Sequence, residues 1–254
     1  MKRVLPHAVL FALGMAGVLS LWPTLDAAVA MVQKADPTRA PPEALLRPLL
    51  LLQPAMLLLL GVVAGAVLAN RVGLRSSIVD SVASGAGLRK VSVDPRLAAI
   101  GGAAAALLLV AGDLLFAQAD PAGFARLAVP ANARLQALVT GVFYGGITEE
   151  IVTRWGLLAL IAWALTKLRM PRHAAIGCAV VAAALVFALG HLPALSLAVE
   201  QPSTLVIVRT IGLNVGAGII FGLAFWRRNL ETAMLGHALT HVLLFGARLA
   251  NVAM

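Results

Sequence analysis

The chain carries very little charge and almost no cysteine. Only 12% of its 254 residues are charged, whereas ordinary soluble domains contain about a quarter. Hydrophobic residues make up 61% of the sequence. This balance excludes a soluble domain of ordinary composition and indicates a protein that lies in a lipid bilayer. The single cysteine, Cys178, excludes an internal disulfide.

The sequence also lacks a basic stripe, although its formal net charge is +9. Its Lys and Arg residues lie mainly in short connections between apolar runs. This placement favours contact with anionic lipid headgroups over binding to a nucleic acid. We therefore expect a lipid bilayer as the partner and no nucleic acid.

Apolar stretches of about 20 residues recur through the whole chain, and each is long enough to cross a hydrocarbon core of about 30 Å. No internal repeat and no segment of soluble composition remain between them. We predict an all-α fold, a polytopic transmembrane bundle of about seven helices, or eight, that forms one integral membrane domain over residues 1–254. The expected helices are residues 5–30, 46–70, 97–118, 133–167, 173–192, 204–226 and 230–250.

The connections between these helices predict the topology. The Pro-rich segment 31–47 is expected to be a loop. Segment 71–96, with five basic residues, is expected to be cytoplasmic or to lie at the headgroups. With the N-terminus inside, the inner connections hold about twice as many Lys and Arg residues as the outer ones. We predict a multi-pass protein of a bacterial inner membrane.

Two consecutive acids and an arginine interrupt the fourth apolar run. Glu149, Glu150 and Arg154 would each cost about 2.5–3.5 kcal/mol at the centre of a bilayer if nothing compensated them. The i,i+4 spacing predicts an ion pair between Glu150 and Arg154, whereas Glu149 is turned about 100° away from that face. The glycines ahead of the acids predict that the long segment 133–167 is tilted or broken there.

Three histidines supply candidate partners for the acids. His191 ends the fifth run, and His237 and His241 share one face of the last run because they are four residues apart. No Glu follows the first of that pair, so the zinc-protease motif HExxH is absent. A single apolar-run histidine is often a hydrogen-bonded core residue, but three beside two buried acids favour a shared site.

Two further polar residues fall inside the sixth run. We interpret Arg209 and Asn214 as residues that pack helices together, and contact with a substrate is the alternative.

The three polar patterns resemble the motifs of the CAAX protease and bacteriocin-processing family, which includes the type II CAAX prenyl endopeptidases. Glu149, Glu150 and Arg154 match its EExxxR, Phe187 and His191 match its FxxxH, and His237 begins its HxxxN. The last position is His241, where that family has Asn or Asp. The similarity covers about residues 140–245, which we interpret as the catalytic core.

The resemblance implies catalytic roles for Glu149, Glu150, His191, His237 and His241, with Arg154 and Phe187 in support. Glu149 would act as the general base while His191 holds the water, and the two histidines of the last helix would stabilise the oxyanion. Glu149, His191 and His237 could instead bind a divalent metal such as zinc. The sequence leaves metal-free and metal-assisted catalysis open, so the cofactor is unknown.

We therefore predict an intramembrane endopeptidase that uses a glutamate-activated water. Its expected partners are membrane-anchored or membrane-associated protein substrates, such as prenylated C-termini, leader peptides or C-terminal sorting signals. The predicted topology opens the glutamates and His191 towards the outer face, unless the span count is wrong by one. The alternatives are an inactive membrane scaffold of the same family and an ion-coupled or proton-coupled transporter.

Overall fold

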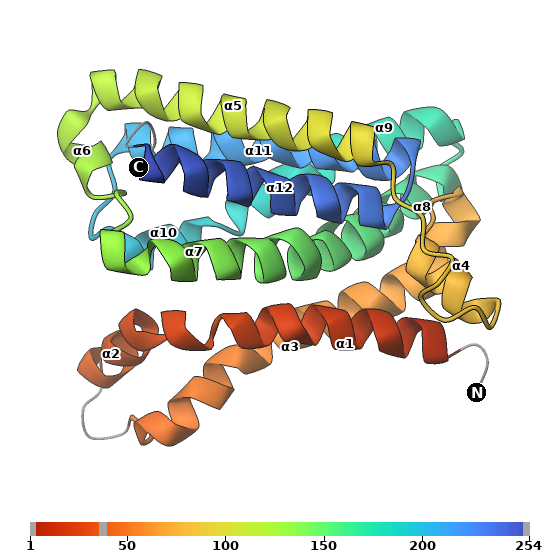
Figure 1. Ribbon diagram of the computed structural model, residues 1–254, viewed down its shortest axis with the longest axis horizontal. Coiled ribbons are helices and arrows are strands. Elements are labelled where there is room, and N and C mark those ends of the chain that lie inside the picture. The colour runs from red at the N-terminus through yellow and green to blue at the C-terminus, as the bar shows by residue number, and fades with distance from the viewer. Residues whose placement is uncertain (1–3, 36–39, 251–254) are drawn as a thin grey trace.

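The computed structural model describes residues 4–35 and 40–250 (Figure 1). Within these residues every regular element is helical, so the predicted all-α fold is confirmed. Part of the predicted loop 31–47, residues 36–39, lies outside the described residues.

The long helices follow the apolar runs closely. The helices are α1 (Leu5–Ser20), α2 (Asp26–Ala35), α3 (Glu43–Leu68), α4 (Ser77–Ala83), α5 (Pro95–Ala119), α6 (Pro121–Ala125), α7 (Arg134–Thr140), α8 (Ala159–Lys167), α9 (Arg172–Leu189), α10 (Leu192–Ala198), α11 (Thr204–Arg227) and α12 (Leu230–Leu249). Short 3-10 turns occur at Trp22–Thr24, Ala69–Val72 and Ala131–Ala133, and π-helical segments at Gly141–Glu149 (η4) and Ile151–Leu158 (η5).

Five described segments are long and apolar enough to cross a membrane: Leu5–Thr24, Glu43–Val72, Pro95–Ala119, Arg172–Ala198 and Thr204–Arg227. They correspond to five of the seven expected spans, and they support an integral membrane protein. The other two expected spans, 133–167 and 230–250, are helical but carry the buried acids and the histidine pair. The number of spans therefore stays a prediction.

Two expected segments need correction. The single helix predicted over 5–30 is divided, because α1 ends at Ser20 and α2 begins at Asp26. Pro23 lies in the turn between them, and proline has no N–H to continue a helical hydrogen-bond ladder. The long segment 133–167 is not broken: it is helical from Arg134 to Lys167, but its hydrogen bonding becomes π-helical at Gly141.

This continuous helix, made of α7, η4, η5 and α8, lies between the α1–α3 pair and the layer of α5, α11 and α12 (Figure 1). Small residues let its neighbours approach closely. A methyl group on Gly156 would come within 2.5 Å of the Cα of Gly61 in α3. Thr148 donates its hydroxyl to the carbonyl of Gly14 in α1 at 2.7 Å. The helix that carries the two acids is therefore the centre of the bundle.

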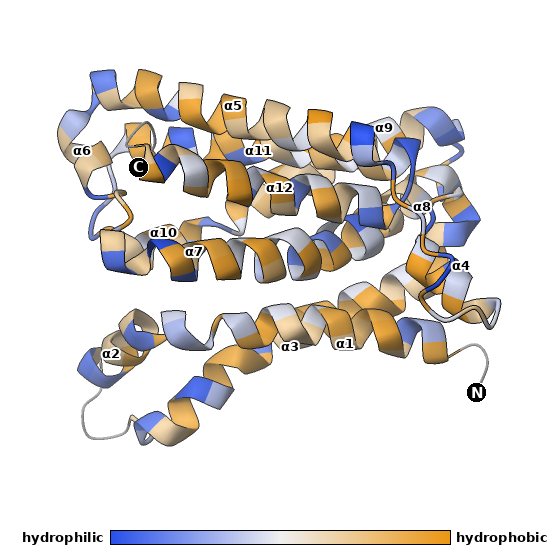
Figure 2. Cartoon of the chain, viewed as in Figure 1, coloured by the Kyte–Doolittle hydropathy of each residue, from blue (hydrophilic) through white to orange (hydrophobic). Residues whose placement is uncertain are grey.

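The outer faces of the long helices are apolar, and hydrophilic residues gather mostly towards the two ends of the bundle (Figure 2). Large exposed hydrophobic side chains line α3 and α5, among them Leu49, Leu52, Leu60, Leu107 and Leu115. Contiguous apolar surface of this kind is rare on soluble monomers. It fits helices that face lipid.

The connections separate into two groups at opposite ends of the bundle (Figure 1). Connections 69–94, 168–171 and 228–229 lie at one end, together with α4. Helices α2, α6 and α10 lie at the other end. These are called the α4 end and the α6 end below. Most of the basic connections lie at the α4 end, in agreement with the predicted alternation of the spans.

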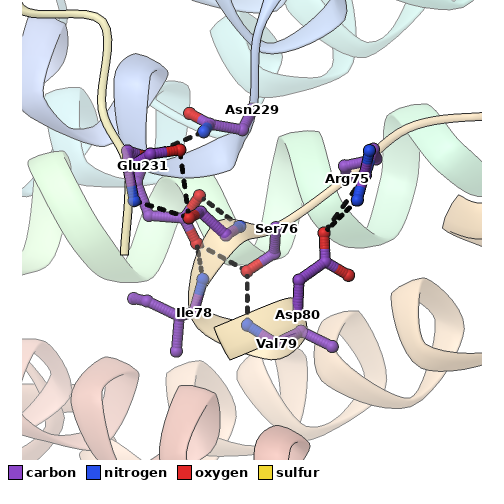
Figure 3. A network of polar contacts seen from close by, with 9 residues as sticks. Arg75, Ser76, Ile78, Val79, Asp80, Asn229 and Glu231 are labelled. Carbon is purple, nitrogen blue, oxygen red and sulfur yellow. Dashed lines mark hydrogen bonds and ion pairs between the residues drawn. The ribbon is translucent and has the colours of Figure 1, made fainter. Parts of the chain in front are cut away.

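At the α4 end a buried carboxylate attaches α4 to the start of α12 (Figure 3). Glu231 is 5% exposed, and it accepts hydrogen bonds from the Ser76 hydroxyl at 2.5 Å and from the backbone N–H groups of Ser77 and Ile78 at 2.8 and 2.9 Å. Asn229 caps α12 and donates to the carbonyl of Ser92 at 2.8 Å. Segment 71–96 is thus attached to the end of the bundle, and its position at the headgroups stays a prediction.

Candidate active site

Glu150 is fully buried, and its carboxylate contacts the side chains of both Arg154 and His237. Its Oε2 lies 3.2 Å from Nε of Arg154, as an ion pair without the alignment of a hydrogen bond. Its Oε1 accepts a hydrogen bond from Nδ1 of His237 at 2.8 Å. The predicted ion pair between Glu150 and Arg154 is therefore present, and it also fixes the last helix. A carboxylate held in this way orients the imidazole and stabilises positive charge that develops on it.

Arg154 is surrounded by partners from three helices. It donates to the hydroxyl of Thr153 and, at 3.2 Å, to the backbone carbonyl of Gly218 in α11. Its guanidinium also lies 4.9 Å from the ring centroid of Phe187 and 5.8 Å from that of Phe221. Contacts with aromatic faces stabilise a desolvated guanidinium. Phe187, predicted as a supporting residue, therefore contacts the arginine of the first motif.

Glu149 behaves differently from its neighbour. It is only half-buried and lines a cavity of about 350 Å³ between η4, the end of α9, α11 and α12. The same cavity is lined by His191, His237 and His241. Consecutive helical residues point about 100° apart, so one acid faces the packed interior and the other the cavity. The structure brings all five predicted site residues to this one region.

His191 lies in the turn between α9 and α10, two residues after the end of α9. Its Nδ1 is 2.8 Å from the backbone carbonyl of Phe187. Because a carbonyl only accepts hydrogen bonds, Nδ1 carries the proton, and Nε2 is the atom that can accept a hydrogen bond or bind a metal. The Phe187 ring also meets the His191 ring edge to face, with centroids 4.6 Å apart.

The two histidines of α12 are stacked on each other. Their ring centroids are 5.1 Å apart with an interplanar angle of 22°, and the other face of His237 lies 4.5 Å from the ring of Phe221. Both Nε2 atoms point to Gly145: a methyl group there would come within 2.8 Å of Nε2 of His241 and 3.3 Å of Nε2 of His237. The absence of a side chain at Gly145 in η4 therefore leaves room for the two imidazole rings.

The predicted metal ligands, Glu149, His191 and His237, line one cavity but do not form a ligand cluster. Among residues 4–35 and 40–250, no group of three or more His, Cys, Asp or Glu side chains is arranged to hold a metal ion. The side-chain types still suit zinc, because a catalytic site of two histidines and one glutamate is common. Metal dependence therefore stays open.

The sequence reasoning missed several residues around the cavity. Tyr144, the single tyrosine of the chain, lines it one turn before Glu149, and Arg248 of α12 lines it as well. Asp113 in α5 forms an ion pair with Arg209, which joins α5 to α11 as the packing interpretation expected. Asn214, which the sequence had already singled out together with Arg209, lines the cavity and donates to the carbonyl of Thr210 at 2.8 Å. Asp113 could have been identified from the sequence as a candidate, since an acid inside an apolar run is rare.

These features define a helical membrane protein with a buried glutamate–histidine centre that adjoins a cavity between the helices. Residues 131–243 match the family model described as type II CAAX prenyl endopeptidase Rce1-like. The predicted resemblance to the CAAX-protease family is confirmed by this match, and the family is one of proteases. No curated protein and no solved structure gives a significant match to the chain.

Proposed function

We propose that the chain is an intramembrane endopeptidase in which Glu149 activates a water molecule for attack on a peptide bond. The observation that carries the proposal is the cavity that Glu149 lines together with His191, His237 and His241, while Glu150 is buried behind it. One acid is thus accessible to a substrate, and the other positions an imidazole.

In the proposed hydrolysis of the peptide bond, each step is assigned to a residue of the site. Glu149 takes a proton from the water, whose second hydrogen is held by Nε2 of His191, and the water oxygen attacks the carbonyl carbon. N–H groups at Nε2 of His237 and His241 donate to the oxyanion, and Glu150 offsets the positive charge on His237. When the C–N bond breaks, Glu149 returns the proton to the leaving amine. If the enzyme used zinc instead, Glu149, His191 and His237 are the residues that would hold the ion, with Glu149 as a ligand in place of its role as base, and the ion would supply a Lewis acid to polarise the carbonyl.

The position of the cavity favours substrates that enter from the side opposite the basic connections. The cavity is lined by Thr24 just before α2, by Ala137 of α7 and by Arg248 in the last turn of α12. Figure 1 shows α2, α7 and this end of α12 in the half of the bundle near the α6 end. By the positive-inside rule that end faces away from the cytoplasm. We propose exported, membrane-anchored proteins of a bacterial inner membrane as the substrates, cut at a leader peptide, a C-terminal sorting signal or a lipid-modified C-terminus.

The test is cleavage of a panel of labelled, membrane-anchored peptides by the detergent-purified protein. Replacing Glu149 with Gln keeps the shape of the side chain but removes the base, so cleavage should fall about 10²–10⁴-fold. His191→Ala should also lose cleavage, and both variants are compared with Glu200→Gln, which changes an exposed acid. Parallel reactions with a chelator decide the metal question. Cleavage by Glu149→Gln at the wild-type rate would overturn the proposal.

A non-catalytic scaffold is the second candidate, because His241 occupies the position where the resembled family has Asn or Asp. The substitution His241→Asn distinguishes the peptidase from the non-catalytic scaffold. An active wild-type enzyme supports the peptidase, whereas an inactive wild type that gains cleavage as His241→Asn supports a scaffold that has lost turnover.

A further inference from the structure

A second cavity, of about 680 Å³, lies at the α4 end of the bundle and is called the α4-end cavity below. Three segments that are distant in the sequence line it: α4 with the residues just before it, the connection from Ser84 to the start of α5, and the turn between α11 and α12. Among the described residues, none lines both this cavity and the one that Glu149 lines. The α4-end cavity is therefore separate from the proposed active site.

Hydrogen bonds hold the walls of the α4-end cavity in place. Oγ of Ser81 donates to the carbonyl of Gly87 at 2.7 Å and accepts from the backbone N–H of Lys90 at 3.2 Å. Oγ of Ser77 accepts from the backbone N–H of Ser92 at 2.7 Å. The connection that follows α4 is thus fastened along α4. Walls that are already ordered lower the entropic cost of binding a ligand.

The charged side chains that line the α4-end cavity number three cations and two acids. Arg75 forms an ion pair with Asp80 at 2.8 Å (Figure 3). Arg228 forms one with Asp94, also at 2.8 Å. The ammonium group of Lys90 forms no ion pair with any residue in the ranges 4–35 and 40–250. The cavity therefore carries an excess of one positive charge.

This lining suits a phosphodiester whose alcohol carries free hydroxyl groups. A phosphodiester has one negative charge, which matches the excess, whereas the acids would repel the second charge of a phosphate monoester. The carboxylates and the serine hydroxyls can accept hydrogen bonds from alcohol hydroxyls. Arginine and lysine only donate, so they are suited to the phosphate oxygens.

The position of the cavity favours a membrane lipid as the source of this group. In the connection that follows α4, Leu88 is 58% exposed and Val93 is 37% exposed, and the exposed Arg89 and Lys90 lie between them. Exposed apolar side chains beside basic ones are typical of a segment at the boundary between headgroups and acyl chains. By the positive-inside rule the α4 end faces the cytoplasmic leaflet, where basic pockets at helix ends attract anionic lipids.

We propose that the α4-end cavity binds the headgroup of an anionic phospholipid with a hydroxylated alcohol, of the phosphatidylglycerol kind. Lys90, Arg75 and Arg228 contact the phosphate, and Asp80 and the serines accept hydrogen bonds from the alcohol. A volume of about 680 Å³ lies in the range of about 300–1,000 Å³ that small-ligand sites have. This site goes beyond the proposed peptidase function and does not depend on it.

Native mass spectrometry of the delipidated, detergent-purified protein tests the site. The protein is titrated separately with phosphatidylglycerol, phosphatidylcholine and phosphatidic acid of the same acyl chains, and the dissociation constant of the first bound lipid is determined. Phosphatidylglycerol should bind about 10-fold more tightly than zwitterionic phosphatidylcholine. It should also bind more tightly than phosphatidic acid, which lacks the alcohol. Equal binding of phosphatidylglycerol and phosphatidylcholine would overturn the site, and tighter binding of phosphatidic acid would overturn the assignment of a hydroxylated headgroup.

Two neighbouring basic residues provide a matched test. Lys90→Gln should weaken the binding of phosphatidylglycerol about 5-fold, and Lys90→Arg should retain it. Arg89→Gln removes the same charge from an exposed residue of the same connection that is outside the cavity lining, so it should leave the affinity unchanged. Equal weakening by Lys90→Gln and Arg89→Gln would contradict the proposal, because binding would then follow the net charge of the surface.

Competition distinguishes a lipid from a soluble ligand of the same chemistry. Glycerophosphoglycerol, the headgroup without acyl chains, and inorganic phosphate are each added at a concentration equal to that of phosphatidylglycerol, and the lipid should stay bound. Displacement by either compound would refute the lipid assignment, because the cavity would then serve a soluble phosphate compound. Hydrogen exchange locates the bound lipid: phosphatidylglycerol should slow exchange in residues 77–93. Protection confined to the α6 end would place the lipid elsewhere and refute the site.

Discussion

Glu150 and Glu231 are both buried carboxylates, but their surroundings differ. Glu231 is satisfied by a hydroxyl and two backbone N–H groups at the start of a short helix, and its partners form a fixed corner of the bundle. Glu150 is paired with a guanidinium and an imidazole, and the imidazole reaches the cavity. A carboxylate bound by backbone donors joins two segments, whereas one bound by titratable groups can also take part in chemistry.

This difference predicts which substitutions damage stability and which damage activity. The largest stability effect should come from Arg154→Ala. It leaves Glu150 buried without its ion pair, and breaking a buried pair costs about 3–5 kcal/mol. The measurement is the free energy of unfolding in detergent. The double variant Arg154→Ala with Glu150→Gln removes the uncompensated charge and should be more stable than Arg154→Ala alone. Equal stability of the two would show that Arg154 does not act through Glu150.

The second difference is the kind of cavity beside each carboxylate, because the cavity next to the Glu150 centre is lined by the three histidines and Glu149, whereas the one next to Glu231 is lined mainly by serines and charged side chains of the α4 end. Gly145→Ala places a methyl group against the Nε2 atoms of His237 and His241. Displacement of catalytic groups by about 1 Å can cost on the order of 10²-fold, so kcat/KM should fall by about that factor while the protein stays folded. Gly177→Ala is the control, since a methyl group there meets nothing within 4 Å. An active Gly145→Ala enzyme would argue against the oxyanion role of the two imidazoles.

At the other centre, Glu231→Ala should act on stability. It removes the acceptor of three hydrogen bonds and detaches α4 from α12. One hydrogen bond to a charged group contributes about 1.5–3 kcal/mol, and water at this end of the bundle can replace the others, so the net loss should be about that of one bond. Thermal unfolding in detergent measures the loss, and hydrogen exchange should increase first in Ser77–Ala83. The affinity of the folded variant for peptides should change little. A selective loss of peptide affinity without loss of stability would contradict the structural role.

The smallest effect concerns pH at the same end. The backbone N–H of Leu97 and the nearby Arg228 hold the pKa of Asp94 below its ordinary value. A lowered folded-state pKa stabilises the protein above the unfolded-state pKa, and this contribution is lost as pH falls through the folded-state value. Acidification from pH 6 to pH 3 should therefore lower the Tm slightly less in Asp94→Asn than in the wild type. Identical profiles would remove Asp94 from the acid response.

The sequence predicted the helices well where the apolar runs were long. The α5, α11 and α12 boundaries fall within two residues of the expected ones, because both ends of each run are marked by Pro, Ser, Asn or charge. It failed at the first helix, where Pro23 turns the chain inside one apolar run. It also gave no sign that Gly141 begins a π-helical segment, since glycine alone suggests a break as readily as a change of hydrogen bonding.

The candidate site was predictable in membership but not in arrangement. Two acids, an arginine and three histidines in apolar runs needed compensation, and this cost alone indicated that they meet. The i,i+4 spacing identified the pair of Glu150 and Arg154. Nothing in the spacing indicated which helix would approach Glu150, so the hydrogen bond from His237 to Glu150 could not be predicted.

The sequence by itself determined that the chain is a membrane protein made of helices, because hydropathy and the need to satisfy backbone hydrogen bonds in lipid leave few alternatives. It also predicted that the polar residues of three runs lie together, and the structure brings them together. Only the tertiary structure decided that Glu149 faces the cavity and Glu150 the interior. That choice depends on which faces of the central helix the glycines allow α1, α3 and α12 to approach, and close packing is a property of the assembled bundle.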